Sequence, residues 1–128
     1  MSIKDQLKIL VVDDMSTSRG LVSQALEAIG IGKVGYADDG NSALKHMQSD
    51  PAHLVISDFN MPGMNGLELL RALRTNAATR SVGFILITGK ATQDLIDTGR
   101  SLGMNNFLKK PFTQQEFRAC LEAVVGRL

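Results

Sequence analysis

Five short apolar runs alternate with stretches of helical periodicity along the chain, and this alternation restricts its fold more than any other feature. The first run, Lys8–Asp14, is rich in β-branched residues and ends in two acids. An unbroken apolar run of this length is typical of a strand buried on both faces, as in a parallel sheet. The other expected strands are 33–37, 53–58, 83–89 and a segment that begins at 106 and ends at 109–111.

Apolar residues at helical spacing follow each run. The first expected helix has Ser16, Thr17 and Ser18 as N-cap candidates and stops at Gly30. Because strands separated by helices pair in parallel through right-handed crossovers, the pattern predicts an α/β fold: a doubly wound five-stranded parallel sheet, (βα)5. The other helices are expected through 43–47, 67–73, 95–102 and 117–125, with 76–82 as a polar connection.

Length, charge and cysteine content exclude several classes of protein. The 128 residues suffice for one domain spanning 1–128, without room for a second. The net charge of +1, with no basic stretch longer than Lys109-Lys110, gives no electrostatic footprint for nucleic acid. No apolar run approaches the roughly 20 residues that span a bilayer, and residues 1–6 lack the apolar core of a signal peptide. We therefore expect a cytoplasmic protein without membrane contact.

The single cysteine, Cys120, leaves no partner for an internal disulfide and no thiolate metal site. It falls among apolar residues at helical spacing. We therefore expect a buried structural thiol.

Polar and charged residues stand where several expected strands end: Asp13, Asp14, Asp58, Thr88 and Lys110. Each has an ordinary explanation when taken alone, since an acid caps a helix or forms a turn, a threonine satisfies a turn, and a lysine is a solvated charge. The carboxyl ends of parallel strands meet at one edge of a doubly wound sheet, and ligands bind there. The sequence therefore predicts one shared site.

The chemistry of this set favours phosphoryl transfer. Three close carboxylates repel one another, so we expect a raised pKa or a cation among them. Oxygen donors without histidine or cysteine favour Mg²⁺. A carboxylate beside Mg²⁺ suits a nucleophile that forms an aspartyl phosphate, which would be Asp58. Lys110 would then neutralise phosphate oxygens and Thr88 would donate a hydrogen bond to another. The peptide bond between Lys110 and Pro111 is left open between cis and trans.

The motifs at these strand ends resemble those of the receiver domains of two-component response regulators, and among them the CheY-like single-domain chemotaxis regulators. The resemblance covers essentially the whole chain and implies the flavodoxin-like version of the predicted fold. Its motifs are 12–14 (Val-Asp-Asp), 37–40 (Ala-Asp-Asp-Gly), 56–62 (Ile-Ser-Asp-Phe-Asn-Met-Pro), 66–70 (Gly-Leu-Glu-Leu-Leu), 87–89 (Ile-Thr-Gly) and 109–113 (Lys-Lys-Pro-Phe-Thr).

The resemblance implies that Asp58 accepts a phosphoryl group from a CheA-like histidine kinase. It further implies that Mg²⁺ is held by Asp14, Asp58 and the main-chain carbonyl of Asn60, with Asp13 acting through a metal-bound water. Lys110 is then the phosphate-contacting lysine. Such a domain catalyses its own phosphorylation and its own later dephosphorylation, and it does not turn over an external substrate.

The resemblance also implies a switch in which the hydroxyl of Thr88 moves toward the phosphate and the ring of Phe107 turns inward. Phe107 is equally well explained as a core residue. CheY-like regulators often carry tyrosine at this position, and the missing hydroxyl removes any output contact made through it. Asn60 and Lys90 occupy the two positions that tune phosphate lifetime in this family. Lys90 replaces what is often an acid, and either attracts anionic donors or hinders a partner phosphatase. Gly89 keeps the small residue that leaves access to the phosphate.

We expect a monomer without an output domain that signals by protein contact, through the face of the helix near 95–102, the last strand and the last helix. The expected partner is a flagellar motor switch protein, or a kinase that uses the chain as a phosphate sink. Three alternatives remain. A haloacid-dehalogenase-like phosphatase would need an acid where Asn60 stands. A flavodoxin-like cofactor module would need a phosphate loop after the first strand. A degenerate receiver would act only as a scaffold.

Overall fold

The computed structural model describes residues 3–128, and Met1 and Ser2, which the expected domain 1–128 includes, lie outside the described residues. Five strands form one sheet in the order β2-β1-β3-β4-β5, and every neighbouring pair is parallel. The predicted doubly wound sheet is therefore confirmed. The strands are β1 (Lys8–Val12), β2 (Lys33–Ala37), β3 (Leu54–Asp58), β4 (Gly83–Thr88) and β5 (Asn106–Lys109).

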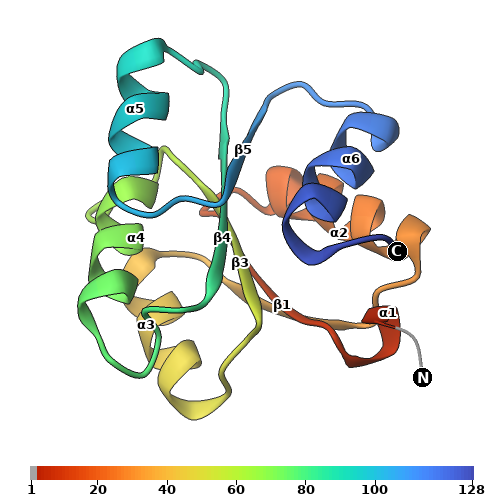
Figure 1. Cartoon of the computed structure of the whole chain (residues 1–128), viewed down its shortest axis with the longest axis horizontal. Coiled ribbons are helices and arrows are strands. Elements are labelled where there is room, and N and C mark those ends of the chain that lie inside the picture. Colours follow the sequence, from red (N-terminus) through yellow and green to blue (C-terminus); the bar gives the residue numbers. More distant parts are fainter. Residues whose placement is uncertain (1–2) are drawn as a thin grey trace.

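Helices cover both faces of the sheet (Figure 1). Two of them, α2 and α6, pack on one face, and α3, α4 and α5 pack on the other. The short α1 precedes β1 and was not predicted, because a single turn is too short to show an apolar repeat. The helices are α1 (Ile3–Gln6), α2 (Ser16–Ile29), α3 (Gly40–Ser49), α4 (Gly66–Thr75), α5 (Gln93–Ser101) and α6 (Gln114–Val125).

The strands are apolar throughout because each face of the sheet carries its own core layer. Along β1, Ile9 and Val11 pack into the layer under α2 and α6, whereas Leu10 and Val12 pack into the layer under α3, α4 and α5. Successive side chains of a strand point to opposite faces, so a strand buried on both faces needs apolar residues at every position. The unbroken apolar runs of the sequence follow from this arrangement.

The expectation that Ser16, Thr17 or Ser18 caps α2 is wrong. The helix begins at Ser16, and its N-cap is Met15, whose side chain makes no capping hydrogen bond. The backbone N–H of Met15 donates instead to the carboxylate of Asp13, at 3.0 Å. Because α2 begins at Ser16, Ser18 lies in the first turn, and its hydroxyl is not used as a cap.

Two further expectations concern single features of the chain. Cys120 is buried, as predicted, and burial raises the pKa of its thiol to about 11. Within residues 3–128 the structure has no helix long and apolar enough to cross a membrane.

Candidate active site

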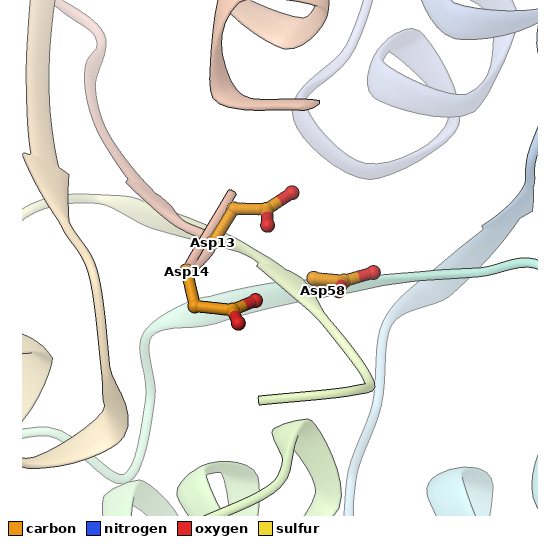
Figure 2. Close-up of side chains that lie close together, drawn as sticks. All are labelled: Asp13, Asp14 and Asp58. Carbon is orange, nitrogen blue, oxygen red and sulfur yellow. The ribbon is translucent and has the colours of Figure 1, made fainter. Parts of the chain in front are cut away.

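Three carboxylates gather at the carboxyl edge of the sheet (Figure 2). Asp13 and Asp14 come from the segment directly after β1, and Asp58 is the last residue of β3. One oxygen from each lies within 4.8 Å of the others. Asp13 and Asp58 are buried, with 3% and 8% of their surface exposed, whereas Asp14 is exposed. The sequence-based expectation that these acids meet is therefore confirmed.

Lys110, which follows β5, brings a cation to the same place. Its Nζ lies 2.9 Å from Oδ1 of Asp58 and 3.9 Å from Oδ2 of Asp13. The same Nζ donates a hydrogen bond of 3.0 Å to the hydroxyl of Ser18. These contacts place the ammonium between the end of β3 and the first turn of α2. The Lys110-Pro111 peptide bond, for which the sequence left cis and trans open, is cis.

The alternation of side chains along the strands explains why these groups converge. Asp58 and Lys110 each follow by two residues the last apolar side chain that their strand sends under α2 and α6, which are Ile56 and Leu108. Residues two apart lie on the same face of a strand. The corresponding position on β4 is Gly89, where an added Cβ would meet nothing within 4 Å. The edge of the sheet is thus charged on β3 and β5 and open between them.

The electrostatics of Asp58 combine opposing effects. Burial raises the pKa of its carboxyl above the ordinary value, the charge of Asp13 acts in the same direction, and the ammonium of Lys110 partly opposes both. A raised pKa in the acid cluster agrees with the sequence-based expectation, but burial contributes more to it than the repulsion between carboxylates on which that expectation rested. Because three carboxylates surround one ammonium, a bound cation would neutralise the remaining negative charge of the site.

The loop between β3 and α4 is tied to the neighbouring strand. The N–H of Phe59 donates to the carbonyl of Ile87 on β4, and the N–H of Gly66 donates back to the carbonyl of Phe59, both at 2.9 Å. A Cβ on Gly66 would lie only 2.5 Å from the carbonyl oxygen of Asp58. Glycine is therefore required where α4 begins against the phosphoacceptor candidate.

A shallow cleft of about 340 Å³ opens beside the acids. Its lining includes Asp14 and the loop after β3, and Asn60 is one of these loop residues. The full lining is Asp14, Phe59, Asn60, Met61, Pro62 and Asn65.

Thr88 stands at the end of β4 and is 3% exposed. Its hydroxyl accepts a hydrogen bond from the N–H of Lys90 at 3.1 Å and donates to the carbonyl of Lys90 at 3.3 Å. Within the described chain, no hydrogen bond joins this hydroxyl to Asp58. The hydroxyl of Thr88 is therefore engaged with the β4–α5 loop, in which Lys90 is exposed.

Phe107 lies on β5 next to Leu86, its partner in the β4–β5 register. Its ring is half-buried and packs against the core layer under α3, α4 and α5. Because Thr88 follows Leu86 by two residues, Thr88 and Phe107 belong to the same face of the sheet. The two proposed switch residues are thus on one face of neighbouring strands, two residues apart in the register.

Two residues of the site were missed by the sequence analysis in this role. Ser18 accepts the hydrogen bond from Lys110, and Nη1 of Arg19 donates to the carbonyl of Asp13 at 2.7 Å. Both are on α2, which the sequence analysis treated as a covering helix. Ser18 and Lys110 are 92 residues apart, and no local pattern links them.

Comparison with known families decides which class of protein carries this site. A family model described as the response regulator receiver domain matches residues 9–122. The chain belongs to the response regulator receiver family. This assignment rules against the haloacid-dehalogenase-like and flavodoxin-like cofactor alternatives.

Individual relatives of this receiver domain cover all or nearly all of its length. It is 46% identical over 128 residues to "Probable chemotaxis protein CheY" of Rhizobium etli, and the alignment covers 100% of this chain and 99% of that protein. It is 35% identical over 122 residues to "Chemotaxis protein CheY" of Pseudomonas aeruginosa, covering 95% of this chain and 98% of that one.

Solved structures agree with the fold of this receiver domain. The chemotaxis protein CheY4 of Vibrio cholerae superimposes with a TM-score of 0.86 at 31% identity, covering 92% of this chain and 98% of that one. The receiver domain of a sensor histidine kinase from Pseudomonas aeruginosa has a TM-score of 0.83 at 26% identity, covering 94% and 98%. That structure has a magnesium ion coordinated in its active site cleft.

Proposed function

We propose that this receiver domain is a phosphoacceptor of a two-component chemotaxis pathway, and that it takes a phosphoryl group from a histidine kinase onto Asp58. The observation that carries the proposal is the ion pair of 2.9 Å between Asp58 and Lys110, beside two further carboxylates. A degenerate scaffold would have no need of a lysine held against a buried acid. The chemotaxis role is supported by the names of the relatives.

The transfer step is a displacement at phosphorus. A carboxylate oxygen of Asp58 forms a bond to phosphorus while the bond from phosphorus to the donor breaks, and the donor leaves with that electron pair. A phosphohistidine donor returns to imidazole after taking a proton from solvent, and acetyl phosphate releases acetate without needing one. Lys110, already against Asp58, neutralises charge on the phosphoryl oxygens.

The donor set fits Mg²⁺. Its atoms are carboxylate oxygens, which are hard ligands, and the exposed Asp14 leaves room for the waters that Mg²⁺ retains. Asp14, Asp58 and the main-chain carbonyl of Asn60 would hold the ion, and Asp13 would act through a water. When bound, the ion supplies positive charge that neutralises the acid cluster and the incoming phosphoryl group.

Thr88 and Phe107 are the proposed switch. The hydroxyl of Thr88 would exchange its contacts with Lys90 for one with the phosphoryl group, and the half-buried ring of Phe107 would turn further inward. Their positions on one face of neighbouring strands support this coupling. Asn60 and Lys90 flank the site and would set the phosphate lifetime.

Output would pass through α5, β5 and α6 by protein contact, either to a flagellar motor switch protein or back to a kinase that uses the domain as a phosphate sink. Binding of the phosphorylated protein to motor-switch fragments and to kinase fragments distinguishes these two outputs. A motor output gives phosphorylation-dependent capture of the switch fragment, and a sink gives capture of the kinase fragment alone.

Incubation with acetyl phosphate and Mg²⁺ tests the proposal directly. The intact mass of the wild-type protein should rise by one phosphoryl group, because the small donor needs no docking partner. Asp58→Asn should remain at its starting mass, and Asp38→Asn serves as a control acid that directly follows β2, two strands away from β3. A wild-type mass that stays unchanged with both acetyl phosphate and a kinase would favour the scaffold alternative.

A further inference from the structure

We propose that Ser18 is a positioning residue that holds the ammonium of Lys110 in place and thereby sets the rate of phosphoryl transfer. This inference rests on the proposed role of Asp58 as phosphoacceptor. It assigns part of the site to α2, a helix that contributes none of the acids and neither of the proposed switch residues.

The contacts of Lys110 leave one donor for a phosphoryl group. An ammonium has three hydrogens. One is directed to Asp58 at 2.9 Å and one to the hydroxyl of Ser18 at 3.0 Å. Asp13, at 3.9 Å, is beyond hydrogen-bonding distance. With two hydrogens fixed by acceptors on different elements, the rotation of the ammonium is determined and the third hydrogen keeps a constant direction.

The acceptor itself is well fixed. Ser18 lies in the first turn of α2, and Val22 and Leu26 of that helix are buried in the core. Its hydroxyl is not used to cap the helix, since the N-cap is Met15. Arg19, the next residue, donates to the carbonyl of Asp13 and so ties the same turn to the acid cluster. The turn therefore holds the cation and the acids in one frame.

Lys110 has space to leave this position. Its side chain is 30% exposed, and it shares with Ser18 a groove of about 550 Å³ between α2 and the segment after β5. Leu21 and Phe112 are among the apolar residues of the groove wall. A long lysine side chain has many rotamers. Without the hydroxyl, the ammonium would spend part of its time in the groove, away from Asp58.

Replacement of Ser18 separates this role from a structural one. Ser18→Ala should lower the phosphorylation rate at saturating acetyl phosphate about fivefold, since a hydrogen bond to a charged group is lost. The donor concentration at half-maximal rate should change less. Ser18→Thr keeps the hydroxyl and should restore the rate to within about twofold. Ser16→Ala, the same change two residues earlier in the turn, is the matched control.

A second readout needs neither metal nor phosphate. In EDTA, acetylation of Lys110 by an N-hydroxysuccinimide ester, followed by peptide mass spectrometry, reports how tightly the amine is held. Relative to the exposed Lys33, labelling of Lys110 should rise about threefold in Ser18→Ala and return in Ser18→Thr. Phosphorylation of Ser18→Ala at the wild-type rate, or labelling of Lys110 that matches wild type in that variant, would overturn the inference.

Failure of the proposed function gives a different result. If wild-type protein gains no phosphoryl group, Asp58 is not the acceptor and the rate-setting part of the inference falls with it. If wild-type protein is phosphorylated and Ser18→Ala is phosphorylated at the same rate, the proposed function stands and the role of Ser18 is refuted.

Discussion

Asp58 is a buried acid whose ionisation is opposed by its surroundings. Burial raises its pKa, and the neighbouring Asp13 adds repulsion that Lys110 only partly offsets. Native Asp58 therefore binds its proton more tightly than the unfolded chain does. The contribution of this residue to folding free energy falls as the pH rises from its ordinary pKa of 3.8 through the raised native value.

Replacing Asp58 by asparagine removes that cost. In EDTA at pH 7.5, Asp58→Asn should raise the free energy of unfolding, because the buried charge and its repulsion with Asp13 are gone. The gain should shrink as the pH approaches 4, where the wild-type acid also becomes neutral. Urea unfolding at both pH values measures the difference. A variant less stable than wild type at pH 7.5 would mean that the ion pair with Lys110 outweighs the burial.

The site residues that the sequence analysis identified lie at the ends of apolar strands. Ser18, which it missed in this role, lies on a helix. Asp58 and Lys110 follow apolar strands, so the parallel topology alone brings them together. The contact between Ser18 and Lys110 depends on the rotation of α2 about its axis and on the reach of a lysine side chain. Neither the rotation of α2 nor the path of the lysine side chain can be predicted from the local sequence. The strand runs are visible there because both faces of the sheet are buried.

At the scale of elements, the start of α4 is fitted against the end of β3. Gly66 is the first residue of α4, and a Cβ there would lie 2.5 Å from the carbonyl of Asp58 and 2.7 Å from a methyl of Leu86. Asn65 and Glu68 form a capping box that fixes the direction of the helix. The start of α4 is therefore held closely against the main chain of the phosphoacceptor candidate.

Gly66→Ala should accordingly damage both stability and the site. The backbone cannot yield as a flexible side chain would, so we expect a loss of about 2–4 kcal/mol in the free energy of unfolding and slower phosphorylation of the folded fraction. Gly20→Ala is the control, since a Cβ there meets nothing within 4 Å, and it should stabilise α2 by about 0.5–1 kcal/mol. Denaturant unfolding of both variants tests the contrast. Equal stabilities would show that α4 shifts without cost.

At the scale of the whole molecule, the three acids lie at the carboxyl edge of the sheet that separates the two core layers. One acid, Asp14, is exposed, and the others are buried. A cation bound there would connect the segment after β1 to the end of β3. Because such binding favours the folded state, metal affinity is expected to appear as added thermal stability.

Asp14→Ala tests this connection. Loss of one carboxylate ligand should weaken Mg²⁺ affinity at least about tenfold, and the rise in unfolding temperature on adding Mg²⁺ should shrink with it. Calorimetric titration and thermal unfolding measure the two effects. Glu27→Ala removes an exposed carboxylate from α2 without touching the cluster, and it should bind Mg²⁺ as wild type does. Equal affinity of Asp14→Ala and wild type would move the metal to another position.

The order of the strands along the chain has a consequence for how the site is assembled during synthesis. The acids occur within the first 58 residues, whereas the lysine that faces them is at position 110. During synthesis the ribosome releases the acids first, and the cation joins them only when β5 docks beside β4. An unfinished chain therefore exposes the acceptor carboxylate without its counter-charge. If Asp58 is the phosphoacceptor, we expect it to be phosphorylated efficiently only after β5 has docked and brought Lys110 to the site.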